Sequence, residues 1–356
     1  MKQINVAIIG QGRSGRNIHG LYFMKDRERF KIAAVSDLLE ERRQRAEREY
    51  GCEAYADYRC LFGRKDVDLV VNATYSHLHV PITKELLENG FNVLCEKPAA
   101  RKAADFDSLV EASKMNGKVF AVFQEVRYAP YFLQIQKVIG SGVLGRIVQI
   151  DLSENYFSRR YDWQTMRERD GGNLLNKGPH QIDHALRLFG PGVMPEITCI
   201  LDDTVSFGDA DDYVKLIFKG KGRPTIDIEM SSCSAYPHAL VNIQGTLGGL
   251  TGDITHVEWK YFKPEEAPKQ KLVREPIVDC DGLPAYCSEE LNWYTESWDF
   301  PANGNAFDAA TANYYDMLYK VLTEGADLGV TLPEVRMQIA VMEECLKRNP
   351  LQALNA

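Results

Sequence analysis

The sequence has no long hydrophobic run: no apolar stretch approaches the roughly 18 residues of a membrane-spanning helix. It also lacks a positive excess, since 50 Asp and Glu residues outnumber 42 Lys and Arg residues and give a net charge of −8. This balance argues against nucleic acid and anionic membranes as partners. Met1 leads directly into a strand-like run, which leaves no room for a signal peptide. We therefore expect a cytoplasmic protein.

Patterns typical of metal sites and disulfide frameworks are missing as well. The 8 cysteines form no C-x-x-C pair, and none lies at metal-ligand spacing from a histidine. In a reducing compartment such cysteines are most simply small buried hydrophobic residues. Cys95, in an apolar run, is interpreted as a packed thiol and not as a nucleophile. No metal site is expected.

At 356 residues the chain is too long for one ordinary domain and suits two. Amphipathic helical stretches separate a series of strand-like apolar runs in the first third of the chain. The runs lie at 4–9, 31–36, 67–73, 91–95 and 118–124, with helices such as 80–89 and 103–115 between them. This alternation predicts an α/β domain, a doubly wound parallel sheet over residues 1–124.

After Gln124 the pattern changes, and residues 125–356 are expected to form an α+β domain for substrate binding and oligomerisation. Short β runs fill residues 196–275 without helices between them, which indicates an open, mostly antiparallel sheet. The other expected elements are helices at 129–139, 179–189, 306–323 and 332–347 and a strand at 146–155. The absence of a long linker predicts that the two domains are tightly apposed.

A complete G-x-G-x-x-G motif follows the first strand-like run and opens a helix. Gly10 permits a tight turn, Gly12 lets the backbone approach a pyrophosphate, and Gly15 allows close packing of helix and strand. Arg13 and Ser14 complete the motif at the helix start, where unpaired N–H groups and the helix dipole favour phosphate. The motif and its context predict a dinucleotide cofactor.

Asp37 ends the second strand-like run, near the expected position about 20 residues beyond the motif. A carboxylate there accepts hydrogen bonds from a ribose diol and repels a 2′-phosphate, which favours NAD over NADP. Arg13, Arg42 and Arg43 argue the other way, because a guanidinium can hold a 2′-phosphate. Arg42 and Arg43 are interpreted as part of the charged helix face 40–49. The simpler alternative for Asp37 is a residue that caps this helix.

Two further strands are expected to end at the same crevice, where such folds bind their ligands. Thr74 and His77 follow the third long run, and both are candidates for cofactor contact. Glu96 and Lys97 follow the run at 91–95. Lys97 is the leading catalytic candidate and a second cofactor contact, whereas Glu96, also a cofactor candidate, is expected to anchor the strand end.

The segment 171–183 is the second informative stretch, since two glycines bring a loop close to a neighbour and a proline suits a helix start. If the segment is helical, Asn176, His180 and Asp183 lie near one face. A histidine facing a cleft can act as general acid or base near neutral pH. Lys177, in contrast, is expected to face solvent, and His184 to be structural.

Aromatic and basic side chains crowd into residues 156–167, just before this segment. They are Tyr156, Phe157, Arg159, Arg160, Tyr161, Asp162, Trp163 and Arg167. Aromatic faces and bidentate polar groups suit a sugar ring, so Tyr156, Arg159 and Trp163 are candidates for substrate binding together with Asn176 and His180. The same residues would also suit a subunit contact.

With these motifs the chain resembles the Gfo/Idh/MocA oxidoreductases, the glucose-fructose oxidoreductase and inositol dehydrogenase group. The resemblance covers nearly the whole chain and is carried by the glycine motif, Glu96-Lys97-Pro98, and the stretch ending in His180 and Asp183. It implies NAD(P)-dependent oxidation of a ring hydroxyl of a sugar or cyclitol, or the reverse. It also implies a homodimer or homotetramer through the C-terminal sheet.

By resemblance, Lys97 matches the family's lysine that contacts the reacting hydroxyl, and His180 matches its acid or base. The sequence departs from the family at three positions. Asn176 replaces a common aspartate, Tyr75 replaces a common proline, and Glu125 replaces a polar residue that is often asparagine. An amide orients imidazole but does not stabilise imidazolium as a carboxylate does. Relatives acting at a sugar's 3-position resemble the asparagine variant, which makes that position one candidate.

Three functions remain open from the sequence. The leading hypothesis is an NAD-dependent dehydrogenase or reductase acting on a ring hydroxyl of a sugar, glycoside or cyclitol. The second is an NAD-dependent glycosidase or lyase that uses transient oxidation at the 3-position and consumes no net NAD. The third is a redox-sensing regulator that binds NAD and a partner protein, and the intact pair Lys97 and His180 argues against it.

Overall fold

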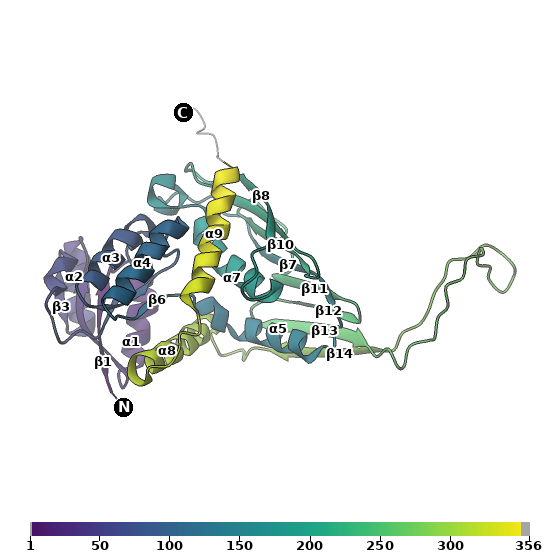
Figure 1. Ribbon diagram of the computed structural model, residues 1–356, viewed down its shortest axis with the longest axis horizontal. Coiled ribbons are helices and arrows are strands. Elements are labelled where there is room, and N and C mark those ends of the chain that lie inside the picture. Colours follow the sequence, from purple (N-terminus) through teal and green to yellow (C-terminus); the bar gives the residue numbers. More distant parts are fainter. Residues whose placement is uncertain (1, 350–356) are drawn as a thin grey trace.

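The computed structural model describes residues 2–349, which build two sheet-based bodies side by side (Figure 1). The first sheet is entirely parallel, in the order β3-β2-β1-β4-β5-β6. Its strands are β1 (Ile4–Ile9), β2 (Phe30–Ser36), β3 (Glu53–Tyr55), β4 (Leu69–Asn72), β5 (Asn92–Cys95) and β6 (Phe120–Val122). The predicted doubly wound sheet is therefore confirmed. The short edge strand β3 was not predicted.

Hydrophobic burial on both faces explains why the central strands of this sheet are almost wholly apolar. All four residues of β4 are buried, as are five of the six in β1. The elements between the strands are η1 (Arg13–Gly20), α1 (Leu21–Lys25), α2 (Glu40–Tyr50), η2 (Tyr58–Leu61), η3 (Ser76–Leu78), α3 (His79–Glu88) and α4 (Ala103–Met115). Among the residues described, no helix is long and apolar enough to cross a membrane.

The second sheet has eight strands in the order β14-β13-β12-β11-β7-β10-β9-β8. They are β7 (Ile147–Asn155), β8 (Glu196–Asp202), β9 (Tyr213–Lys219), β10 (Thr225–Ser231), β11 (Val241–Gly245), β12 (Gly248–Gly252), β13 (His256–Phe262) and β14 (Trp293–Asp299). All neighbours are antiparallel except β7 and β10. The prediction of a mostly antiparallel sheet is confirmed.

The edge strand β14 was missed by the sequence analysis, which ended the β region at residue 275. Residues 263–292 leave the sheet after β13 and extend far from the body before β14 returns (Figure 1). β14 then pairs with β13 from Trp293 opposite Phe262 to Asp299 opposite His256. Pairing across so long a connection leaves no local signal in the sequence.

Helices fill the space between the two sheets (Figure 1). They are η4 (Glu125–Tyr128), α5 (Pro130–Ser141), η5 (Trp163–Thr165), η6 (Arg167–Arg169), α6 (Asn173–Asn176), α7 (Gly178–Phe189), α8 (Ala306–Glu324) and α9 (Leu332–Arg348). Helix α8 returns to the first domain, where the Tyr314 hydroxyl donates to the Val122 carbonyl (2.7 Å) and Tyr315 stacks on Tyr22 (4.5 Å between centroids). The last helices of the chain thus stabilise the first domain.

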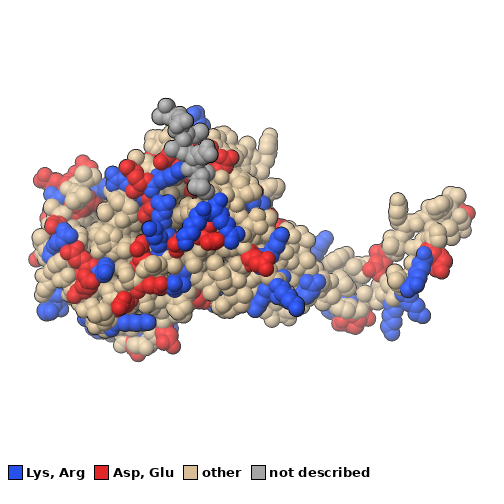
Figure 2. Space-filling model, turned by 45° about the horizontal axis from the view of Figure 1, so that its top comes forward, with Lys and Arg blue, Asp and Glu red and all other residues tan. Residues whose placement is uncertain are grey.

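A buried ion cluster fixes the end of the first sheet to the second domain. The guanidinium of Arg127 on η4 contacts both carboxylate oxygens of Asp183 on α7 and also Glu334 on α9 (2.7 Å). Asp183 therefore turns away from the site, although the sequence analysis grouped it with Asn176 and His180. Acidic and basic side chains are otherwise interspersed over the face shown in Figure 2.

Asp183→Asn should lower the free energy of unfolding by about 3 kcal/mol, because it leaves a buried guanidinium short of its closest counter-charge. The exposed pair Lys25–Asp308 gives the matched control, since Asp308→Asn should cost at most about 1 kcal/mol. Urea unfolding monitored by circular dichroism measures both. Equal losses for the two variants would contradict a clamping role for the buried pair.

Candidate functional site

The three glycines of the motif differ in how much space surrounds them. Gly10 has a φ of +88°, and a Cβ there would collide with the Ala73 carbonyl. A Cβ on Gly15 would collide with the Gly10 carbonyl. A Cβ on Gly12 would instead meet only the Arg42 Nη1 at 3.7 Å, so this side of the loop is open. An open backbone beside a helix start fits a pyrophosphate, and the residues present therefore fit a dinucleotide.

The helix after the motif begins as the π-helix η1 and continues as α1. Arg13 is exposed and Ser14 half-buried at its first turn, where both can reach a phosphate. The Gln11 side chain, inside the loop, is buried with neither of its polar atoms hydrogen-bonded. An unpartnered buried amide at this position is further support for a bound polar group.

Asp37 lies beside this loop at the end of β2. Its Oδ2 accepts from the Gln11 N–H (2.7 Å), and its Oδ1 accepts from the Leu39 N–H (2.9 Å). The Arg42 Nη1 lies 3.4 Å from Oδ2, and Arg43 donates to the Asp37 carbonyl (2.8 Å). The two arginines belong to the charged helix α2 (Glu40–Tyr50), as interpreted, and their guanidinium groups reach back to the strand end.

Thr74 and His77 follow β4 as predicted. The Thr74 hydroxyl donates to the Asn72 Oδ1 (2.7 Å), which holds the strand end. The rings of His77 and Tyr75 are stacked (6.0 Å), and Tyr75 meets Trp163 edge-on (4.9 Å). This aromatic cluster joins the first domain to the loop 156–167 of the second.

At the end of β5, Glu96 and Lys97 have separate partners. The Glu96 carboxylate contacts the His19 Nε2 (3.1 Å), and the other ring nitrogen of His19 contacts the Tyr315 hydroxyl (2.6 Å). Burial alone would raise the pKa of Glu96, but the hydrogen bond and charge of His19 leave it below its usual value. Glu96 therefore anchors the strand end, and Lys97 Nζ instead donates to the Asn176 carbonyl (2.9 Å).

The segment around Asn176 is not one continuous helix, because α6 ends at Asn176 and α7 begins at Gly178. The Asn176 side chain accepts from the Gln164 amide (3.3 Å), and no hydrogen bond to His180 is found among the described residues. Burial, followed by the charge of Lys97, holds the pKa of His180 well below its usual value. The expected orientation of His180 by Asn176 is thus not seen in the geometry.

The carboxyl group beside His180 comes from Glu125 on η4, just after β6. Glu125 Oε1 lies 3.9 Å from His180 Nε2, and the residue is only 2% exposed. Burial and the nearby Glu96 charge raise the pKa of Glu125 to about 8. Lys97, His180 and Glu125 therefore gather titratable groups of both domains at one place.

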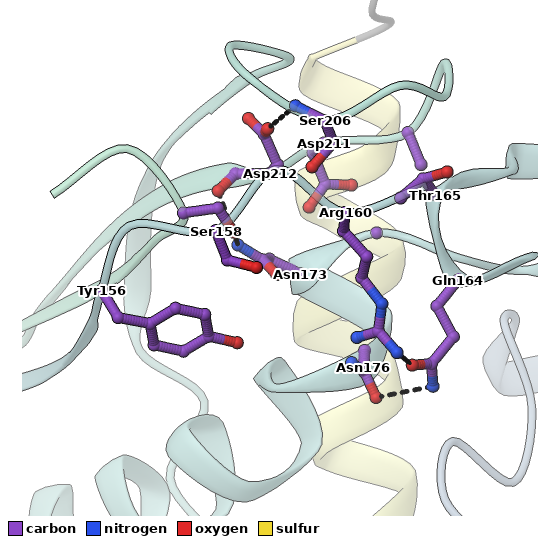
Figure 3. A pocket seen from close by; sticks show the side chains of 13 residues that line it. Tyr156, Ser158, Arg160, Gln164, Thr165, Asn173, Asn176, Ser206, Asp211 and Asp212 are labelled. Carbon is purple, nitrogen blue, oxygen red and sulfur yellow. Dashed lines mark hydrogen bonds between the residues drawn. The ribbon is translucent and has the colours of Figure 1, made fainter. Parts of the chain in front are cut away.

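A polar cavity of about 120 Å³ lies on the side-chain side of Asn176 (Figure 3). It is lined by Tyr156, Ser158, Arg160, Gln164, Thr165, Gly172, Asn173, Asn176, Ser206, Ala210, Asp211, Asp212 and Ser232. The Arg160 guanidinium donates to the Gln164 side chain, which in turn reaches Asn176 (Figure 3). Asn176 thus faces the cavity with its side chain and holds Lys97 with its carbonyl. The lining is rich in hydrogen-bonding groups, which suits a polyhydroxyl ligand.

Of the predicted substrate residues, Tyr156 and Asn176 line the cavity, and His180 does not. Arg159 and Trp163 do not line it. The Arg159 guanidinium lies over Phe207 (4.7 Å to the ring centroid), and Trp163 packs on Tyr75.

Lys177 is 5% exposed and not solvent-facing as expected, with its Nζ 3.9 Å from the Tyr156 ring centroid. Its aliphatic stem is buried, and the aromatic face partly replaces water around the ammonium. Burial lowers the pKa of Lys177. The prediction of a solvent-facing Lys177 was wrong because the helix is interrupted between α6 and α7 at this residue.

Several lining residues were missed by the sequence analysis, above all Asp211 and Asp212. They precede β9, far along the chain from the loop 156–167. Asp211 Oδ2 accepts from the Leu174 N–H (2.7 Å), and burial raises the pKa of Asp211 to about 6. The paired aspartates before a strand were the only local signal.

Two structural interpretations are confirmed. His184 contacts the Val126 carbonyl (3.0 Å) and stacks on Phe132 (3.6 Å), within the core. Cys95 is fully buried, which raises the pKa of its thiol to about 12. Among residues 2–349 no cluster of three His, Cys, Asp or Glu side chains could hold a metal ion.

Known proteins share both domains. Residues 4–124 match the family described as "Oxidoreductase family, NAD-binding Rossmann fold", and residues 132–251 match the "GFO/IDH/MocA C-terminal domain". The chain is 30% identical over 267 residues to 2,7-anhydro-N-acetylneuraminate hydratase of Mediterraneibacter gnavus, a match that covers 71% of this chain and 68% of the hydratase. It is 29% identical to scyllo-inositol 2-dehydrogenase (NADP(+)) of Bacillus subtilis, over 97% of this chain and 93% of that enzyme.

The fold is also found in levoglucosan dehydrogenase, solved in complex with NADH and L-sorbose. The TM-score is 0.78 at 19% identity, with 98% of this chain and 96% of that one covered. The parallel first sheet and the mixed C-terminal sheet agree with these matches. The chain therefore belongs to the Gfo/Idh/MocA family of oxidoreductases, with an NAD(P)-binding Rossmann domain and the family's C-terminal domain.

Proposed function

We propose that the protein is an NAD-dependent dehydrogenase or reductase acting on a ring hydroxyl of a sugar, glycoside or cyclitol. The observation that carries the proposal is the bond from Lys97 Nζ to the Asn176 carbonyl. This bond brings the ammonium of a cofactor-domain strand to Asn176, a residue that lines the polar cavity. A ring in that cavity would present a hydroxyl to Lys97 and His180.

Residues of the first domain would hold the cofactor, and residues of both domains would act on the substrate. Gly12 and the start of η1 would hold the pyrophosphate, and Asp37 the ribose. When bound, the nicotinamide supplies a hydride acceptor or donor. Lys97 would orient the reacting hydroxyl, and His180, held neutral by burial, would take up its proton. Hydrogen-bonding groups such as Arg160 and Asn176 would fix the other ring hydroxyls.

The named relatives support this substrate class. One full-length relative acts on scyllo-inositol, a cyclitol, and the solved levoglucosan dehydrogenase holds NADH and a sugar. The 3-position of a glycoside remains one candidate for the oxidised carbon. The cavity lining carries both Arg160 and two aspartates, so it selects a polar ring by hydrogen bonds and not by net charge.

A redox-neutral reaction is the second candidate, because the 30% identical relative is a hydratase. Adding or removing water changes no net oxidation state. In such a reaction oxidation of one ring carbon would acidify the neighbouring C–H, permit elimination, and be reversed before product release. A glycosidase or lyase acting in this way would use the same cavity, lysine and histidine.

One experiment separates the two candidates and tests Lys97. Wild-type protein, Lys97→Ala and Lys84→Ala, a control at an exposed lysine on α3, are each incubated with NAD and a panel of sugars, glycosides and cyclitols. Reduced-nicotinamide absorbance and aglycone release are recorded together. We expect stoichiometric NADH from wild type and a loss of roughly 10²-fold or more in turnover for Lys97→Ala alone, the scale of a lost proton-transfer group. Aglycone release without NADH would favour the redox-neutral reaction, and full turnover by Lys97→Ala would remove the lysine from the mechanism.

The cofactor preference rests on Asp37 and is tested separately. NAD should bind at least about tenfold tighter than NADP, a difference of about 1.4 kcal/mol. Asp37→Ala should narrow this ratio by removing the charge that repels a 2′-phosphate. The lost bonds to Gln11 and Leu39 would weaken both cofactors, so the ratio of the two dissociation constants is the readout. Tighter binding of NADP to wild type in a fluorescence titration would refute the preference and assign Arg42 to the phosphate.

We also propose that copies of the chain associate through the C-terminal sheet into a homodimer or homotetramer. Helices cover one face of this sheet, and the other face is only half-buried along β9 and β10 (Figure 1). On it Lys215 contacts Asp227 (2.7 Å) and Glu229 (3.1 Å). Light scattering should give two or four times the chain mass of 40.3 kDa, and a monomer mass would contradict the proposal.

A further inference from the structure

Glu125 is a buried acid with an incomplete set of partners. It follows β6 at the start of η4 and faces α7, where its Oε1 lies 3.9 Å from His180 Nε2. Its Oε2 has no hydrogen-bond partner, and neither has the Nδ1 of His180. Burying a carboxyl without partners destabilises a fold, so an acid at this place is a cost that packing does not explain.

The surroundings of Glu125 make its charge sensitive to the site. Glu96 and Lys97 act on it from the end of β5 with opposite signs. The charge of Glu125 in turn helps to raise the pKa of Tyr131 on α5 and of Tyr314 and Tyr315 on α8.

We propose that Glu125 is the carboxyl partner of His180, and that the pair takes up the proton released by the reacting hydroxyl; this inference rests on the proposed function. In the oxidation direction the hydroxyl O–H bond breaks and an imidazole N–H bond forms. The proton on the other imidazole nitrogen then passes to the Glu125 carboxylate as a carboxyl O–H. The electron pair of the broken C–H bond leaves with the hydride to the nicotinamide. In the reduction direction the Glu125 carboxyl returns the proton.

The distance and the position of Glu125 both support this role. Although 3.9 Å is longer than a hydrogen bond, catalytic hydrogen bonds are often long in unliganded structures and tighten in the complex. Side chain 176 carries an amide and binds Gln164, so no carboxylate approaches His180 from α6. Glu125 approaches the same imidazole from η4, just after the last strand of the first sheet. Glu125 is a positioning residue, because it acts on the substrate only through His180.

The role has a definite pH dependence. Uptake of a proton needs the ionised carboxyl, and burial raises the pKa of Glu125 to about 8. The pKa of His180 lies well below its usual value, so the imidazole is neutral throughout the range around pH 8. The kcat/KM for oxidation should therefore rise with pH through about 8, while the reduction, which needs the carboxyl form, should be fastest below it.

Glu125→Gln tests the proposal, with Glu111→Gln at an exposed position on α4 as the matched control. We expect Glu125→Gln to lower kcat for oxidation by about 10- to 100-fold. It should also abolish the rise of kcat/KM for oxidation near pH 8 and leave the cofactor dissociation constant unchanged. Glu125→Asp keeps a titratable carboxyl group, so its kcat/KM for oxidation should still rise with pH. An unchanged pH profile in Glu125→Gln would overturn the proposal, even if kcat or stability fell.

A second measurement is independent of turnover. Side-chain ¹⁵N NMR of His180 in the complex with NAD should show a change in tautomer or chemical shift as the pH passes about 8. The change should be absent in Glu125→Gln and present in Glu111→Gln. If the His180 signal of the wild-type protein stays constant across this pH range, the proposed pairing of Glu125 with His180 is wrong. If instead the signal responds but no ring alcohol is oxidised, the proposed function fails and the pairing of Glu125 with His180 stands.

Discussion

The buried contact between Arg127 and Asp183 connects the two halves of the site. Arg127 stands two residues after Glu125 on η4, and Asp183 stands three residues after His180 on α7. Because the guanidinium contacts both carboxylate oxygens, the contact fixes the relative position of the two segments. A shift between them would separate Glu125 from His180 and Lys97 from Asn176. The ion pair is therefore a positional device, whatever it adds to stability.

Titratable groups gather near this contact, where Glu96 and Glu125 are buried and Lys97 and His180 are half-buried. Glu96, Lys97, Glu125 and His180 lie within one small volume at the ends of β5 and β6, and only some of them have a full set of partners. Glu96 is satisfied by His19, and Lys97 by a carbonyl. The carboxyl and imidazole of Glu125 and His180 are not satisfied in the same way. Incomplete satisfaction of buried polar groups is typical of sites that handle protons.

Features read from neighbouring residues were predicted well from the sequence. The six residues of β1, the glycine motif and the ends of α4 depend on local patterns, and the predicted boundaries agree with the structure. Features that depend on distant segments were not predicted. The partner of His180 was sought four residues away at Asn176, whereas the carboxyl that lies beside it belongs to Glu125, 55 positions earlier in the chain. Likewise Asp211 lines the cavity and β14 pairs with β13, and in both cases the partners are separated by a long stretch of chain without a periodic pattern.

The most direct test of the account is a crystal structure of the dead-end complex with reduced cofactor and a ring alcohol taken from the substrate panel. The account predicts the ring in the cavity beside Asn176, with one hydroxyl within about 3 Å of both Lys97 Nζ and a His180 ring nitrogen. It also predicts the cofactor along the carboxyl ends of the first sheet. A ring bound elsewhere, or a hydroxyl out of reach of both side chains, would contradict it.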